Sequence, residues 1–144
     1  MNIEYSENKL TADKYNNFEM KMWNGETTPR EQVERFLPHQ LFSVCAIKDN
    51  EIVGIARLDG DTAYNFYIND IYVLPEYQGK GIGNTMLKKL IKYVKETCIP
   101  GTTVCIYLFS SAGKEGFYEK LGFLRRPDST DGAGMELEFV VDGE

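Results

Sequence analysis

The chain has 144 residues, of which 42% are hydrophobic and 26% charged, so its size and composition are those of one globular domain. We therefore predict a single domain over residues 1–144. A net charge of −6 argues against general nucleic-acid binding and favours a cationic small substrate. No apolar run approaches the ~20 residues of a membrane span, and the first ten residues do not resemble a signal peptide. We expect a cytoplasmic protein without membrane contact.

Two amphipathic helices are predicted near the N-terminus, after an edge strand within the first ten residues. Apolar residues recur at helical spacing over 11–23. The segment 28–37 carries its own start signals, because Thr28 can cap the helix, Pro29 suits its first position and Glu31 completes a capping box. Two helices are therefore expected before the main β region.

Apolar and β-branched runs predict the strands that follow. Turn residues separate these runs, which are 41–47, 52–58, 63–75, 103–109, 123–126 and 135–141. The short segment "KDNE" between the first two runs predicts a hairpin. The run 103–109 is almost wholly apolar, as expected for a strand buried on both faces. A helix that starts at Ile82 and ends before Pro100, and a shorter one over 113–122, interrupt them. The order predicts an α/β to α+β fold, with helices on both faces of a mixed sheet.

A glycine-rich loop stands where the fourth predicted strand gives way to a helix. It reads Gln78-Gly79-Lys80-Gly81-Ile82-Gly83-Asn84-Thr85. Unpaired N–H groups at a helix start attract anions, glycines let those groups approach a ligand, and Lys80 adds a cation. The loop therefore predicts a phosphate or pyrophosphate site, although a flexible turn uses glycine too. Its spacing fits neither the dinucleotide-binding fingerprint nor a Walker loop.

The loop resembles the fingerprint of the GNAT acetyltransferases, in which Gln or Arg is followed three residues later by Gly and five residues later by Gly or Ala. Gln78, Gly81 and Gly83 fit it, after the strand end "DIYVLPEY". The segment 116–123, "GFYEKLGF", resembles the fourth helix and following strand of that family. The resemblance runs from end to end and implies a mostly antiparallel sheet of six to seven strands with about four helices.

This resemblance implies acetyl-coenzyme A as the acetyl donor, with no metal. The Ile71 N–H would contact the thioester carbonyl, Val73 would pair with the pantetheine arm, and Ser111 stands where many relatives carry an asparagine for that arm. The remaining positions that match the coenzyme site are those of the loop, namely Gln78, Gly79, Lys80, Gly81, Ile82, Gly83, Asn84 and Thr85.

Catalytic roles follow from the same resemblance. Tyr118 matches the tyrosine that protonates the departing thiolate, which suits a phenol with an ordinary pKa near ~10. Asp70, beside Ile71, is the side-chain candidate for the base, and a purely structural carboxylate is equally expected there. Some polyamine-type relatives carry an acidic pair at this place, whereas this chain has Asn69 and Asp70.

We therefore predict an N-acetyltransferase that moves acetyl to a primary amine by direct attack in a ternary complex. The acidic chain favours a small cationic acceptor, selected by residues such as Trp23, Phe36, Tyr64 and Tyr67. A protein or peptide N-acetyltransferase, a transferase of longer acyl groups and a non-catalytic acyl-coenzyme A sensor are the alternatives. The apolar C-terminal strand predicts a possible homodimer edge.

Overall fold

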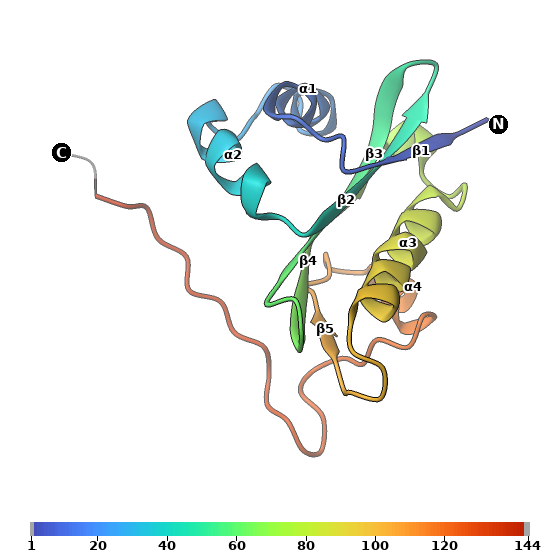
Figure 1. Ribbon diagram of the computed structural model, residues 1–144. Coiled ribbons are helices and arrows are strands. Elements are labelled where there is room, and N and C mark those ends of the chain that lie inside the picture. Colours follow the sequence, from blue (N-terminus) through green and yellow to red (C-terminus); the bar gives the residue numbers. More distant parts are fainter. Residues whose placement is uncertain (1, 143–144) are drawn as a thin grey trace. The chain divides into compact units, whose positions relative to one another are not determined.

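A computed structural model describes residues 2–142 of the chain (Figure 1). The chain separates into two compact units, the first ending at Leu108 and the second beginning at Phe109. Each unit is described by itself below, and the single domain over 1–144 stays a prediction.

The first unit is built on a five-stranded sheet in which the spatial order follows the chain order. Neighbouring strands are antiparallel except the last pair, β4 and β5, which is parallel. The fold is therefore the expected mixed, mostly antiparallel α/β arrangement. The strands are β1 Glu4–Glu7, β2 Phe42–Lys48, β3 Glu51–Gly60, β4 Asn65–Val73 and β5 Cys105–Tyr107.

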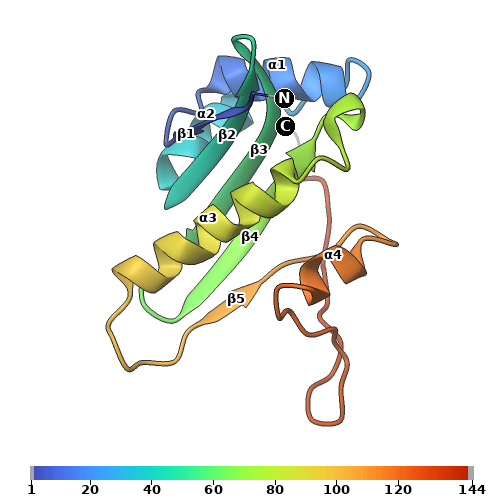
Figure 2. The same ribbon diagram turned by 90° about the vertical axis from the view of Figure 1, so that its right-hand side faces the viewer.

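Helices cover both faces of this sheet. α1 (Ala12–Met22) and α2 (Arg30–Phe36) lie on one face, and the long α3 (Ile82–Thr97) lies on the other (Figures 1 and 2). Short 3₁₀ turns, η1 (Leu37–His39) and η2 (Pro75–Tyr77), follow α2 and β4. The apolar stripe of α3 is fully buried at Met86, Leu87 and Leu90, which closes a core on that face.

The β2–β3 hairpin shows how local sequence sets the register. Asp49 and Asn50 form its turn with φ angles of 49° and 64°. Positive φ at both central residues is the geometry of a type I′ turn, for which Asn and Asp are favoured. The hairpin predicted from the segment between the two apolar runs is confirmed.

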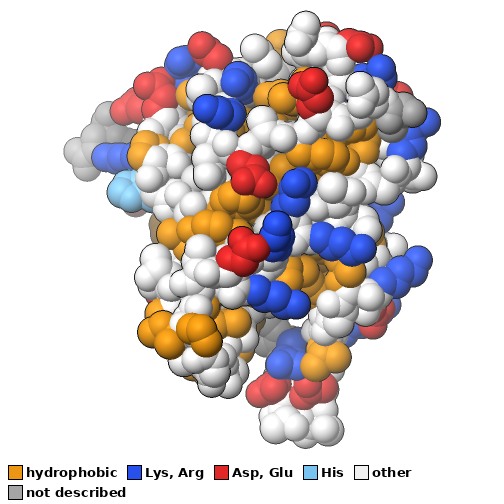
Figure 3. Space-filling view, turned by 45° about the vertical axis from the view of Figure 1, so that its right-hand side comes forward, with side chains coloured by type: hydrophobic (Ala, Val, Ile, Leu, Met, Phe, Trp, Pro, Cys, Tyr) orange, Lys and Arg blue, Asp and Glu red, His pale blue; other side chains and the backbone are white. Residues whose placement is uncertain are grey.

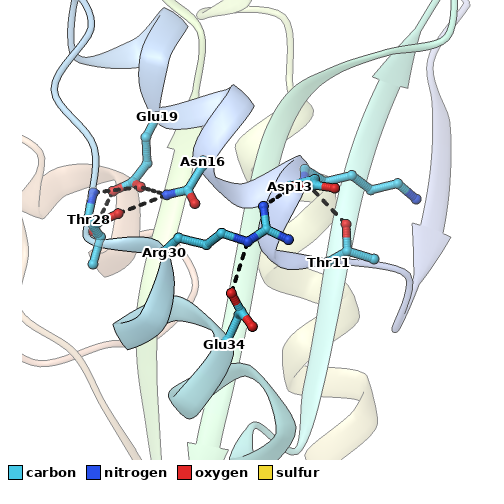
Figure 4. Close-up of polar contacts among 8 residues, drawn as sticks. Thr11, Asp13, Asn16, Glu19, Thr28, Arg30 and Glu34 are labelled. Atoms are coloured by element: carbon cyan, nitrogen blue, oxygen red, sulfur yellow. Dashed lines mark hydrogen bonds and ion pairs between the residues drawn. The ribbon is translucent and has the colours of Figure 1, made fainter.

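The connection between α1 and α2 is held by one buried carboxylate rather than by the predicted capping box. Glu19 is only 7% exposed and accepts hydrogen bonds from the Thr28 N–H at 2.9 Å, the Thr28 hydroxyl at 2.6 Å and the Asn16 amide at 3.0 Å (Figure 4). The Thr28 hydroxyl is thus committed to Glu19. α2 starts at Arg30 without a side-chain cap, so the capping role of Thr28 was wrong.

The second unit contains one helix, α4 (Glu115–Glu119), within the described residues. Gly122, with φ of 96°, follows it in the left-handed conformation expected of a C-terminal glycine. The strands expected at 123–126 and 135–141 do not form, so the described chain has five strands instead of six to seven. A strand requires a partner for its backbone groups, and no ladder within 2–142 includes these segments.

The exposure of the late apolar segments shows that a further expectation, a strand over 103–109 buried on both faces, was also wrong. The large apolar side chains of 135–141 are between 72% and 91% exposed. β5 keeps only three residues of the apolar run 103–109, and Tyr107 is 51% exposed, so this strand is not buried on both faces. β propensity and apolarity alone therefore overstated both segments.

Within the described residues, no helix is long and apolar enough to cross a membrane. Among residues 2–142, no group of three or more His, Cys, Asp or Glu side chains could hold a metal ion. All three cysteines are free thiols, Cys45 buried and Cys98 and Cys105 half-buried.

Alkaline pH should destabilise the fold through Cys45. Burial raises the pKa of its thiol from 9.0 to about 11. Because the unfolded thiol ionises first, the stabilisation is complete below pH 9 and is lost as pH rises toward 11, by about 2 kcal/mol. Urea unfolding between pH 8 and 11 should show this loss, and Cys45→Ala should flatten the dependence. Cys98→Ala is the control and should retain it; equal slopes in all three proteins would contradict the assignment.

Candidate functional site

A β-bulge in β4 changes which face of the sheet its side chains reach. Before the bulge Ile68 lies opposite Leu58, and after it Asp70 lies opposite Arg57, so Asn69 is the extra residue. Opposite residues share a face, and the consecutive residues Arg57 and Leu58 point to opposite faces. Asp70 consequently points to the face that α1 and α2 cover, while Ile68 points toward α3.

The same strand has an open edge on its far side. Its ladder with β5 covers only residues 65–67. The Leu74 N–H donates to the Val53 carbonyl at 2.9 Å, so the backbone groups of every second residue before Leu74 also point to β3. Ile71 and Val73 alternate with those residues, and their N–H groups point to the open edge. The N–H groups of Ile71 and Val73 thus point away from β3 in the first unit, and the coenzyme contacts assigned to them in the sequence analysis stay predictions.

The glycine-rich loop follows directly and opens α3. Gly79 and Gly81 have φ angles of +75° and +84°, a conformation that glycine adopts without strain, and no atom lies within 4 Å of a Cβ built on either residue. Gly81 is the N-cap of α3 and makes no side-chain cap. Gly79 and Gly81 thus leave clear space beside the start of this 16-residue helix, whose first N–H groups lie at the positive end of its dipole.

Side chains of the loop serve partly to hold its shape. The Gln78 amide donates to the Val73 carbonyl at 2.9 Å, which ties the loop back to the open edge of β4. The Thr85 hydroxyl donates to the Gly81 carbonyl at 3.0 Å. Lys80 is exposed, and further Lys and Arg side chains lie on the side of the molecule that Figure 3 shows. Coenzyme contacts of Gln78, Lys80 and Thr85 stay predictions.

Asp70 takes part in a buried cluster on the opposite face. Arg57 Nε lies 2.5 Å from Asp70 Oδ2, and both side chains are less than 10% exposed. The Tyr15 hydroxyl donates to the same oxygen at 3.3 Å, and the guanidinium lies 4.3 Å from the ring centroid of Phe36. The cluster joins α1 and α2 to the sheet at the bulge. Its geometry favours the structural alternative for Asp70, and the base role stays a prediction.

The second unit carries the other two predicted site residues. Tyr118 lies on α4 between the rings of Phe117 and Phe123, with centroid distances of 4.9 and 5.9 Å and edge-to-face geometry. Burial raises the pKa of its phenol, which keeps the hydroxyl protonated at neutral pH. Ser111 is exposed, and its carbonyl accepts from the Lys114 N–H at 3.0 Å.

Residues 8–123 match the acetyltransferase (GNAT) family. The chain belongs to this family. Of its relatives, a Porphyra purpurea protein named as an uncharacterized N-acetyltransferase is 32% identical over 108 residues, which are 72% of this chain and 60% of the relative. The [ribosomal protein bS18]-alanine N-acetyltransferase of Haemophilus influenzae is 35% identical over 105 residues, covering 70% of this chain and 64% of that protein. The chain thus spans less than two-thirds of these relatives.

A solved structure agrees with the family assignment. The crystal structure of a Staphylococcus aureus protein named as a probable acetyltransferase superposes with a TM-score of 0.81 and 27% identity. The alignment covers 96% of this chain and 100% of the other. The GNAT fold inferred from the loop and the "GFYEKLGF" segment is therefore confirmed.

Sequence reasoning missed several charged and polar residues that lie between the sheet and the first two helices. Arg57 and Asp59 were taken as parts of an ordinary strand and turn, and Tyr15 and Glu19 as ordinary residues of an amphipathic helix. One signal was available, because Arg57 is the lone charge within the apolar run 52–58. A buried charge requires a partner, so an acid on a neighbouring strand could have been sought.

Removing the Arg57 guanidinium should be strongly destabilising. Arg57→Met leaves the Asp70 carboxylate buried without its cation, at a cost of about 3 kcal/mol. The double variant Arg57→Met/Asp70→Leu should recover most of this loss, since two apolar side chains can replace a buried ion pair. Urea denaturation measures both. Arg30→Met is the matched control, because Arg30 pairs with Glu34 at an exposed site and should matter little. Equal losses in the two single variants would contradict the argument.

Proposed function

We propose that this chain is an N-acetyltransferase that moves the acetyl group of acetyl-coenzyme A to a primary amine. One observation carries the proposal: the open edge of β4, with the N–H groups of Ile71 and Val73, is followed by the glycine-rich loop at the start of α3, where Gly79 and Gly81 leave clear space. An extended amide-containing arm can pair with a free strand edge, and a pyrophosphate suits a helix start. In acetyl-coenzyme A the acetyl thioester is followed by such an arm, pantetheine, and then by a pyrophosphate, which is the order of the two sites along the chain.

The residues present fit this coenzyme. A side chain at position 79 or 81 would occupy space near the start of α3 that glycine leaves clear. The backbone amides of 79–84 would hold the pyrophosphate, and Lys80 would add positive charge. Acetyl-coenzyme A would supply an activated thioester, and the chain would supply the surfaces that bind and orient it.

The proposed chemistry needs few groups. The amine nitrogen attacks the thioester carbonyl carbon, and the Ile71 N–H stabilises the charge that develops on the carbonyl oxygen. The carbon–sulfur bond breaks, and Tyr118 gives its phenolic proton to the thiolate. An ammonium acceptor thus yields an amide, a thiol and one proton released to solvent. This chemistry does not depend on which group acts as the base, for which the sequence analysis named Asp70 as a candidate.

We propose a small cationic amine as the acceptor. Support comes from the net charge of −6 and from the surroundings of the bulge, where carboxylates outnumber Arg57. A protein N-terminus is the second candidate, and one observation favours it: the Haemophilus influenzae relative is named for an alanine of a ribosomal protein. Cytoplasmic localisation and a homodimer remain part of the proposal.

Thiol release from acetyl-coenzyme A tests the function directly. The panel consists of 1,4-diaminobutane, spermidine, tyramine, glycinamide, an aminoglycoside and a hexapeptide beginning with alanine. We expect release with at least one cationic small amine, and preference for the hexapeptide would favour the second candidate. Tight coenzyme binding without release from any amine would overturn the enzyme proposal in favour of an acyl-coenzyme A sensor.

A further inference from the structure

Two carboxylates stand on the α1/α2 face of the sheet beside the bulge, and their surroundings differ. Asp70 is buried, paired with Arg57 at 2.5 Å and hydrogen-bonded by the Tyr15 hydroxyl at 3.3 Å. Its charge is therefore balanced within the fold. A side chain already committed to a guanidinium and a phenol has little capacity to bind a second cation.

Asp59 lies on β3, two residues beyond Arg57 and therefore on the same face. It is half-buried, and Tyr67 lies opposite it on β4. Its carboxylate accepts a hydrogen bond from the side-chain amide of Asn69, the bulge residue. This partner is neutral, and none of the ion pairs within residues 2–142 includes Asp59. It is thus a carboxylate at the bulge whose charge remains available.

Resting on the proposed function, we propose that Asp59 binds the acceptor ammonium at the bulge and takes its proton before attack. The cross-strand pair of Asp59 and Asn69 would then bind the cationic acceptor in place of the acidic pair that some polyamine-type relatives carry on β4. Asn69 positions the carboxylate, because its amide fixes one oxygen and leaves the other for the ligand. Asp70 holds the bulge instead of acting as the base.

The proton balance is simple. The acceptor enters as an ammonium, one N–H proton passes to an Asp59 oxygen, and the nitrogen lone pair becomes free to form the bond to the carbonyl carbon. The second N–H proton leaves on amide formation, and the thiolate takes one proton from Tyr118. Asp59 then returns its proton to solvent, and Tyr118 recovers its own from the nitrogen through solvent. No oxidant, reductant or further reactant is needed.

The electrostatic surroundings suit this role. Desolvation raises the pKa of Asp59; Arg57 on the same strand lowers it, and Asp70 on β4 raises it. Tyr67 lies opposite on β4, and the Tyr15 hydroxyl of α1 is turned to Asp70. A base with a raised pKa is closer to the working pH and accepts a proton more readily. A cationic ligand beside Asp59 would also stabilise the charged carboxylate, which burial disfavours.

The test compares Asp59→Asn with wild type, using the panel amine that has the highest kcat/KM. We expect kcat/KM at pH 7 to fall about 100-fold, with coenzyme A affinity and unfolding temperature unchanged. The deficit should shrink as the pH approaches the pKa of the amine, because the free amine then no longer needs a base. Asp59→Glu should restore part of the rate. A merely structural role for Asp59 would not produce this convergence.

Asp49→Asn provides the matched control, since it removes the same charge at an exposed turn whose carboxylate pairs with Lys48. It should behave as wild type. Thiol release that is unchanged in Asp59→Asn, or a deficit that stays constant with pH, would overturn this inference and leave the acetyltransferase proposal intact. Absence of thiol release with every amine in wild type would overturn both.

Discussion

Gly81→Asp is expected to abolish coenzyme A binding while the chain stays folded. Gly81 has a φ of +84° and caps α3, and its position has room for a side chain. An aspartate there would accept hydrogen bonds from the first N–H groups of α3 and place a negative charge where the pyrophosphate should bind. We expect a loss of at least about 100-fold in affinity, which corresponds to ~3 kcal/mol.

Gly101→Asp is the matched control, because Gly101 follows α3, has a φ of +85° and also has no atom within 4 Å of a built Cβ. Backbone strain of about 1–2 kcal/mol should be similar in the two variants. Calorimetric titration with coenzyme A should therefore show binding only in Gly101→Asp, at similar unfolding temperatures. Normal binding in Gly81→Asp would show that the loop is not the pyrophosphate site.

The parts of the structure that sequence reasoning predicted are those with local causes. The turn at Asp49 and Asn50, the stripe of α3 and the glycines before it each depend on residues within a few positions of one another. The backbone roles of Ile71 and Val73 were predicted as well, but through resemblance to a family rather than through spacing. Sequence order alone does not state where two parallel strands stop pairing.

The parts that escaped prediction depend on partners far apart in the chain. Thr28 looked like a helix cap until Glu19, nine residues away, proved to take its hydroxyl. Arg57 and Asp70 are separated by thirteen residues, and their pairing requires the bulge, which leaves no local signature. The segment 135–141 shows the converse: strong β propensity produces no strand without a partner edge.

Tyr118→Phe should lower kcat by about 100- to 10,000-fold and leave coenzyme A affinity unchanged. The substitution keeps the ring and its edge-to-face contacts with Phe117 and Phe123, and it removes only the hydroxyl. Without a proton donor the thiolate is a poorer leaving group, so the tetrahedral adduct returns to reactants more often. Thiol release under saturating substrates measures the effect, and calorimetry measures coenzyme affinity.

The pH dependence separates this role from a packing role. Because burial raises the pKa of Tyr118, wild-type kcat should stay constant through neutral pH and fall only above the ordinary tyrosine value of ~10. Tyr118→Phe should lack that alkaline limb. Tyr93→Phe is the control, since Tyr93 stacks on Phe42 with a centroid distance of 4.5 Å and lies outside the proposed chemistry. If both variants turn over at the wild-type rate, the proton comes from solvent, and Tyr118 serves only to pack α4.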